Sequence, residues 1–145
     1  MTLVVDAGAV VDLLLRRPTA AAIGRALEAD ADDLHAPALL DLEVLSALRR
    51  LTLGGELAAR RAEEAIDDFG ALPILRHGHA TLLSRVWQLR ANMTAYDAAY
   101  VVLAEGLGDD AVVVTLDRRL ARAVADRTAV RTFVPDPPAV GSLSR

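Results

Sequence analysis

Hydrophobic residues gather along this chain in two kinds of segment that alternate with each other. Short continuous apolar runs, such as residues 2–6 and 112–115, are typical of strands that are buried on both faces of a sheet. Longer segments have apolar residues on one helical face, and glycine or proline ends several of them, as Gly54-Gly55 does after residue 53. Such alternation is typical of an α/β protein.

The pattern can be written as a set of expected elements. The predicted strands are residues 2–6, 34–36, 72–75, 112–115 and, at an edge, 130–134. The predicted helices are residues 9–15, 18–29, 39–53, 56–69, 80–90, 95–107 and 118–125. Because strands that alternate with helices form parallel sheets, we expect an α/β sandwich around a central parallel sheet. Residues 1–134 are expected to form a single domain, and residues 135–145 a flexible C-terminal tail.

Composition narrows the classes of function. The chain has 145 residues, 53% of them hydrophobic, with no cysteine and a formal net charge of −4. The lack of cysteine excludes a disulfide framework and a thiolate metal site. No apolar run approaches the ~18 residues of a membrane span, and no basic segment of a signal peptide precedes the first strand, so a cytoplasmic location is expected. The negative charge argues against nucleic-acid binding by bulk positive charge, although bound cations reverse the sign locally.

Four acidic residues stand where an unpaired carboxylate is costly. Asp6 and Asp117 follow predicted strands, at the edge of the sheet where α/β proteins carry their active sites. Glu43 and Asp97 lie on mostly apolar faces of predicted helices, where burial disfavours a charge. A divalent metal explains all four, because Mg²⁺ and Mn²⁺ prefer oxygen ligands. Carboxylate-bound metals hydrolyse phosphodiesters, so we expect this chemistry here.

Each of these residues also has an ordinary structural explanation. Asp6 and Asp117 occupy N-cap positions before predicted helices, and Thr94 with Asp97 fits a capping box. Glu43 could form a plain ion pair with an arginine two turns further along its helix. The caps are independent of one another, whereas a metal site accounts for the four residues together.

Other candidate motifs are weaker. The chain has neither a glycine-rich nucleotide-binding motif nor any lysine, so a P-loop and a phosphoacceptor receiver domain are disfavoured. His77-Gly78-His79 suggests a transition metal only weakly, and we expect these histidines in a surface loop. Trp87 is interpreted as a core or interface residue rather than as a platform for base stacking.

Four segments together resemble a known family. They are Val4-Val5-Asp6-Ala7, the helix around Glu43, Thr94-Ala95-Tyr96-Asp97-Ala98-Ala99-Tyr100, and Thr115-Leu116-Asp117-Arg118-Arg119-Leu120. In this order they resemble PIN-domain ribonucleases, and in length and style most of all the VapC toxins of bacterial toxin–antitoxin pairs. The resemblance covers residues 2 to 134, and the third segment is its most specific part.

The resemblance implies a three-layer α/β/α sandwich and RNA cleavage that depends on Mg²⁺ or Mn²⁺. It makes Asp6, Glu43, Asp97 and Asp117 an acidic quartet, in which the three aspartates hold the metal directly or through water. Glu43 would orient the attacking water or help to hold a second ion. Thr115, two residues before Asp117, matches the hydroxyl residue that supports the quartet from behind.

The resemblance also implies partners and leaves alternatives open. A cognate VapB-type antitoxin would place a basic side chain in the acidic pocket, and the toxin would form a homodimer. Arg118 and Arg122 could steer the RNA backbone, although a solvated helix face is the more ordinary explanation of these two residues. Many relatives carry Ser, Thr or Asn where this chain has Gly8, which leaves room for a binding scaffold with weakened catalysis. A metal-dependent DNA nuclease uses the same chemistry.

Overall fold

The strands form one parallel sheet in the computed structural model, which describes residues 1–29 and 33–139. The strands are β1 (Thr2–Val5), β2 (Asp33–Pro37), β3 (Ile74–His77), β4 (Ala111–Val114) and β5 (Arg131–Phe133). Their order across the sheet is β3-β2-β1-β4-β5, and every neighbouring pair is parallel. The central strands β1 and β4 are the most deeply buried, as their unbroken apolar runs predict.

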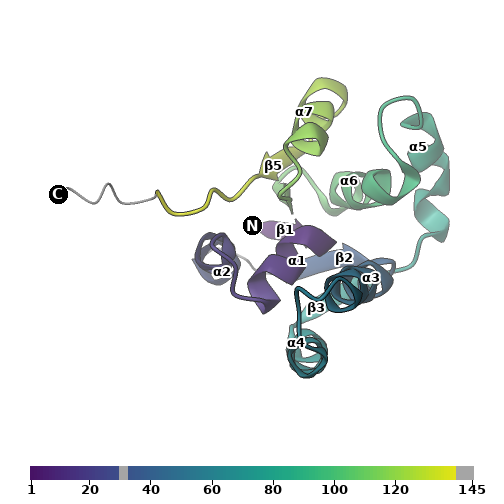
Figure 1. The fold of residues 1–145 in the computed structure, drawn as a ribbon. Coiled ribbons are helices and arrows are strands. Elements are labelled where there is room, and N and C mark those ends of the chain that lie inside the picture. Colours follow the sequence, from purple (N-terminus) through teal and green to yellow (C-terminus); the bar gives the residue numbers. More distant parts are fainter. Residues whose placement is uncertain (30–32, 140–145) are drawn as a thin grey trace.

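The helices form a layer on each face of this sheet. They are α1 (Ala7–Leu14), α2 (Ala20–Ala29), α3 (Leu40–Leu53), α4 (Ala59–Ala71), the 3₁₀ turn η1 (Ala80–Leu82), α5 (Leu83–Gln88), α6 (Ala95–Leu107) and α7 (Arg118–Arg127). Figure 1 shows α1 to α4 on one side of the strands and α5 to α7 on the other. Right-handed crossovers require this division, because the chain moves outward from β1 to β3 and then returns through β4 to β5. The predicted three-layer sandwich is confirmed.

Most element boundaries differ from those predicted by one to three residues, and two of the differences have a clear local cause. Strand β3 begins at Ile74, two residues late, because the backbone N–H of Leu72 still bonds to Phe69 at the end of α4, and Pro73 has no N–H to offer a sheet. The helix predicted over residues 80–90 is divided into η1 and α5. It stops at Gln88, where the N–H of Leu89 is shared between the carbonyl groups of Arg85 and Val86 in a tight turn.

The centre of the sheet is also the point where the chain changes face. Strand β1 leads into α1 on one face, and the adjacent β4 leads into α7 on the other. The two strand ends are joined by a hydrogen bond from the N–H of Asp6 to the carbonyl of Val114, 3.1 Å long. A crevice forms at such a switch point because the segments that follow the two strands diverge to opposite faces of the sheet. The fold therefore provides a binding site where the first and last predicted carboxylates stand.

The predicted tail is only partly covered by the structure. Residues 135–139 have neither helix nor strand, and residues 140–145 lie outside the described part of the chain. Within that part, no helix combines the length and the apolar character that crossing a bilayer requires.

Candidate active site

The first and last carboxylates of the predicted quartet cap helices. Asp6 precedes α1, and its Oδ1 accepts a hydrogen bond from the N–H of Ala9 at 2.9 Å. Asp117 precedes α7, and its Oδ1 accepts from the N–H groups of Arg119 at 2.9 Å and Leu120 at 3.1 Å. Both residues therefore satisfy backbone donors that a helix start leaves without a partner.

The other two carboxylates lie in the first turns of longer helices. Asp97 is three residues into α6 from its cap Thr94, whose Oγ1 accepts from the N–H of Asp97 at 3.2 Å. Glu43 lies in the first turn of α3, where its Oε1 accepts a hydrogen bond from the hydroxyl of Tyr100 at 2.7 Å. Glu43 makes no ion pair within residues 1–29 and 33–139, so the alternative explanation of Glu43 by an arginine of its own helix is wrong.

All four carboxylates nevertheless meet in one pocket. It has a volume of about 360 Å³ and is lined by Asp6, Ala7, Gly8, Glu43, Asp97, Tyr100, Leu116 and Asp117. Four helices begin around this pocket because helices of an α/β sandwich start at the carboxyl edge of its sheet. Their amino ends carry partial positive charge, which makes it less unfavourable to gather carboxylates there. Capping and clustering are thus features of the same residues and do not exclude each other.

Burial and mutual repulsion raise the pKa values of Asp6, Glu43 and Asp97, so these three carboxylates hold their protons more tightly. The pKa of Asp6 rises from 3.8 to about 6, mainly because the carboxyl group is desolvated, and also because Asp97 and Glu43 add negative charge nearby. Desolvation likewise raises the pKa of Glu43, although the hydrogen bond from Tyr100 opposes the increase. The pKa of Asp97 is raised by desolvation and by the charge of Asp117. A pocket of this kind favours a bound cation.

The chemistry of the donors fits Mg²⁺ or Mn²⁺. The polar side chains that line the pocket offer only carboxylate and hydroxyl oxygens, which are the ligands that these hard cations prefer. No three His, Asp or Glu side chains of the described residues form a ready coordination group. Mg²⁺ usually retains several waters and binds through one or two carboxylates, so a pocket with separated carboxylates suits it.

Comparison with known proteins places this architecture in a family. The sequence model of the PIN domain matches residues 3–125. The chain belongs to the PIN domain family. Ribonuclease VapC3 of Mycobacterium tuberculosis is 43% identical over 120 residues, which are 83% of this chain and 85% of that protein. Ribonuclease VapC1 of the same organism is 45% identical over 124 residues, covering 83% and 89% of the two chains. The fold matches the crystal structure of PAE2754 from Pyrobaculum aerophilum, with a TM-score of 0.59 and 24% identity over 91% of this chain and 90% of that one.

Thr115 connects two members of the quartet in this PIN domain. Its side chain is fully buried directly after β4, which ends at Val114, one residue earlier than predicted. The hydroxyl group donates a hydrogen bond to the Asp6 carboxylate, which lowers the pKa of Asp6 against the effect of burial. The same oxygen accepts from the backbone N–H of Asp117 at 3.0 Å. Thr115 therefore fixes the position of one carboxylate relative to the other.

The arginines predicted to guide RNA do not line the acidic pocket. Arg118 pairs with Asp136 of the C-terminal segment, and Arg122 is exposed further along α7. The neighbouring Arg119 is the closer cation, because it lines a second cavity together with Asp97 and Asp117. Its charge lowers the pKa of Asp97. Sequence reasoning missed Arg119 because all three arginines follow Asp117 closely, and only the direction of α7 distinguishes them.

Tyr100 was missed as well. Tyr100 lies one helical turn after Asp97, on the same face of α6. Its hydroxyl reaches Glu43, which is 57 residues away along the chain. The signal available in the sequence was the spacing of three residues from Asp97, which places two helical side chains side by side. That spacing does not reveal which distant helix the hydroxyl meets.

The remaining candidates also differ from expectation. Trp87 is 67% exposed with the guanidinium of Arg90 4.6 Å from its ring centre, so it is not a core residue. His77 ends β3, where its Nε2 lies 2.7 Å from Nδ1 of the buried His35. His79 accepts a hydrogen bond at 3.1 Å from the N–H of Leu39, just before α3. The histidines are therefore structural contacts at the edge of the sheet rather than free residues of a surface loop.

Proposed function

We propose that this PIN domain protein is a metal-dependent endoribonuclease of the toxin type. The observation that carries the proposal is the meeting of Asp6, Glu43, Asp97 and Asp117 in a single pocket at the switch point of the sheet. The names of the VapC relatives, which are ribonucleases, support RNA as the substrate. The match to these relatives extends through most of both chains, which supports a shared activity rather than a shared fragment.

The roles of the carboxylates follow from their positions. Asp6, Asp97 and Asp117 would hold Mg²⁺ or Mn²⁺, directly or through water. When bound, the ion stabilises the negative charge of the phosphoryl group and makes hydroxide available near neutral pH. Thr115 holds Asp6 and Asp117 in a fixed position relative to each other, which leaves the two carboxylates little freedom to move.

Glu43 is suited to direct the attacking water. One of its oxygens is held by Tyr100, and its raised pKa makes it a better proton acceptor than an exposed glutamate. The water oxygen attacks phosphorus in line with the bond to the 3′ oxygen, and Glu43 receives the proton that the water loses. The phosphorus–3′ oxygen bond breaks and the departing 3′ oxygen takes a proton from solvent, which leaves a 5′-phosphate and a 3′-hydroxyl.

The decisive experiment is cleavage of total RNA by the purified chain with Mn²⁺, with Mg²⁺ and with EDTA. Asp97→Asn should abolish the metal-dependent fragments, because it removes a charge from the pocket while keeping the shape of the side chain. Asp126→Asn is the matched control, since this exposed aspartate of α7 lies outside the pocket. Full cleavage by Asp97→Asn would refute the assignment of the site.

The remaining outcomes separate the alternatives. Cleavage of single-stranded DNA but not RNA would indicate a DNA nuclease with the same centre. No cleavage with any metal would favour a binding scaffold, for which the lack of a side chain at Gly8 is the supporting feature. Gly8→Ser is then the first variant to test for restored activity.

A cognate VapB-type antitoxin is the proposed regulator. Four carboxylates in one pocket create a negative potential that attracts a basic side chain of a partner. Co-expression with the neighbouring small open reading frame should yield a complex, and its formation should abolish cleavage. Recovery of the two proteins separately would contradict this form of control.

A homodimer is also proposed. Exposed apolar side chains such as Leu83 and Trp87 on α5, 63% and 67% exposed, support an interface between copies. Light scattering at several concentrations should give twice the chain mass. A monomer at every concentration would remove this proposal without affecting the active site.

A further inference from the structure

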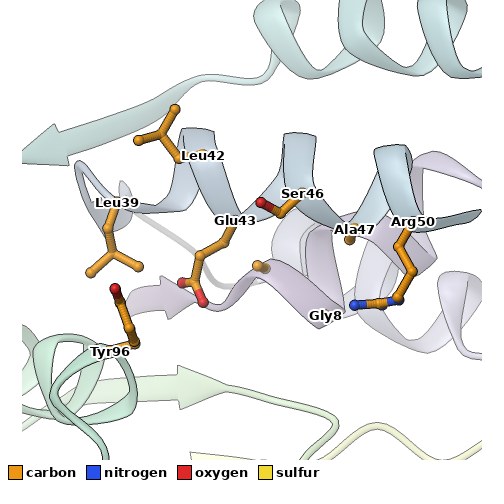
Figure 2. A pocket seen from close by; sticks show the side chains of 9 residues that line it. Gly8, Leu39, Leu42, Glu43, Ser46, Ala47, Arg50 and Tyr96 are labelled. Atoms are coloured by element: carbon orange, nitrogen blue, oxygen red, sulfur yellow. The ribbon is translucent and has the colours of Figure 1, made fainter.

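A groove continues from the acidic pocket along helix α3. It has a volume of about 550 Å³ and shares Ala7, Gly8 and Glu43 with the acidic pocket. From there it runs beneath α3 to Arg50, with Tyr96 on its opposite wall (Figure 2). A ligand that enters the acidic pocket therefore has a continuous surface on which its neighbouring parts can lie.

Arg50 provides a positive charge at one end of this groove. It follows Glu43 by seven residues, so the two side chains leave the same face of α3 about 10 Å apart along its axis. Figure 2 shows both side chains directed from α3 toward α1. Among the described residues Arg50 has no side-chain hydrogen bond and no ion pair, unlike Arg76 and Arg85, which are both paired with carboxylates. An unpaired guanidinium suits a phosphate group.

Tyr96 provides an aromatic surface on the other wall. It stands immediately before Asp97 in the first turn of α6 and is 65% exposed, which is unusual for so large a ring. In contrast, Tyr100 on the same helix is buried and uses its hydroxyl to hold Glu43. An exposed ring beside a carboxylate centre offers a face on which an unpaired base can stack.

Gly8 lies at the boundary between the acidic pocket and the groove, because it lines both. It lies in the first turn of α1 with no left-handed backbone angle, so its conformation does not require glycine. A Cβ atom placed there would meet only the Asp6 carboxylate oxygen at 3.7 Å and a Leu116 methyl at 4.0 Å. The missing side chain therefore leaves free space at the boundary of the two cavities. No backbone atom approaches Gly8 closely enough to require a glycine there.

We propose that this groove binds the nucleotides of single-stranded RNA that flank the scissile phosphate. One base stacks on Tyr96, and a phosphate further along the strand contacts Arg50 while the scissile phosphate occupies the acidic pocket. The inference rests on the proposed nuclease function and adds the path of the substrate. Single-stranded RNA fits because its bases are free to stack and its phosphates repeat along the chain, which matches an aromatic wall and a separate cation.

Binding to a short fluorescent RNA in Ca²⁺, measured by anisotropy at several salt concentrations, tests the path without requiring cleavage. A gel run after each titration verifies that the RNA remains intact. Arg50→Gln should weaken binding and reduce the slope of log K against log salt by about 0.7, the value for one phosphate contact on a single strand. Arg49→Gln, an exposed neighbour on α3 outside the groove, is the matched control and should change neither quantity. Equal effects of the two substitutions would overturn the role of Arg50.

The stacking contact has its own test. Tyr96→Leu should lower the affinity about 5- to 150-fold, the range of one base–aromatic stack, while Tyr96→Phe should bind like the wild type. An RNA of the same length without bases should not distinguish Tyr96→Leu from the wild type. If Tyr96→Leu binds intact RNA normally, the base does not stack there.

These outcomes are separable from those of the proposed function. A wild-type chain that binds RNA with the expected Arg50 and Tyr96 dependence but cleaves nothing would sustain the groove and contradict the nuclease. Cleavage with neither dependence would sustain the nuclease and contradict the groove. Variants that lose a co-expressed protein partner but retain RNA affinity would identify a protein-docking site and also overturn the proposal.

Discussion

The replacement of Asp6 by asparagine should stabilise the protein when no metal is present. The substitution removes a charge from a crowded pocket but preserves the helix cap, because the asparagine oxygen can accept the hydrogen bond from Ala9 as the aspartate does. It therefore removes the electrostatic cost of the cluster, although one of the two oxygens available to the hydroxyl of Thr115 is lost with the charge. In EDTA, where no cation compensates the charge, this cost should be fully visible.

The magnitude follows from the pKa of Asp6. The value rises from 3.8 to about 6 on folding, and each pKa unit corresponds to about 1.36 kcal/mol. Because the folded-state pKa is the higher one, the folded protein binds the proton more tightly. The resulting stabilisation is fully present below pH 3.8 and is lost as the pH rises through about 6. At pH 7 the wild type should thus lack about 1–3 kcal/mol that Asp6→Asn retains.

Thermal melts in EDTA between pH 4 and pH 8 measure this difference. The two proteins should melt at similar temperatures at pH 4, and Asp6→Asn should melt about 3–10 °C higher at pH 7. Asp126→Asn is the control, because this exposed carboxylate of α7 lies outside the acidic pocket. Its melting temperature should stay close to that of the wild type at each pH.

Two results would refute the reasoning. A lower melting temperature of Asp6→Asn at pH 7 would mean that Asp6 acts mainly through its hydrogen bonds. A gain that is the same at pH 4 and pH 7 would mean that its origin is not the ionised carboxylate. Addition of Mn²⁺ should reverse the order of the two proteins, since a ligand that binds only the folded state stabilises the variant that binds it better.

Three further predictions concern neighbouring groups. Gly8→Ser should tighten Mn²⁺ binding up to about 10-fold in calorimetry while Gly8→Ala does not, because only the serine brings a hydroxyl next to the acidic pocket. Tyr100→Phe should raise the pKa of Glu43 further by removing the hydrogen bond that lowers it, so the acid limb of the pH–rate profile should move to higher pH. The pKa of His35 is lowered by desolvation and by His77, so the contribution of His35 to stability should decline as the pH falls below about 6.5. In denaturant melts, the free energy of unfolding of the wild type should therefore fall relative to that of His35→Gln as the pH is lowered.

The alternation of elements was predictable from the sequence because strand length, apolar continuity and helix ends are local properties. The boundaries of 95–107 agree with α6 at both ends, since Thr94 caps the helix and Gly108 follows it. The start of β3 was not predictable in the same way. Residues 72 and 73 are as apolar as a strand, and only the hydrogen bond that ends α4 decides that they belong to the connection.

The contacts of the site also fall into local contacts, which the sequence predicts, and contacts between distant elements, which it does not. The helix caps formed by Asp6, Thr94 and Asp117 are local, and the spacing of their partners in the sequence predicts them. The partner of Glu43 was not predictable, because Tyr100 is 57 residues away and on another helix. The choice of Arg119 over Arg118 depends on the same packing between elements, which no pattern along one helix contains.

The helix ends that hold the carboxylates also prepare them for a cation. In Asp117 both backbone hydrogen bonds go to Oδ1, and in Glu43 the tyrosine hydroxyl binds Oε1, so each side chain is fixed by one oxygen. The second oxygen of each has no hydrogen-bond partner among the described residues and remains available within the pocket. A ligand whose orientation is fixed before binding loses less freedom when the ion arrives. The cost in stability falls at Asp6, where burial disfavours the charged carboxylate. A substitution that keeps the helix cap but removes the charge therefore distinguishes the structural role of such a residue from its functional role.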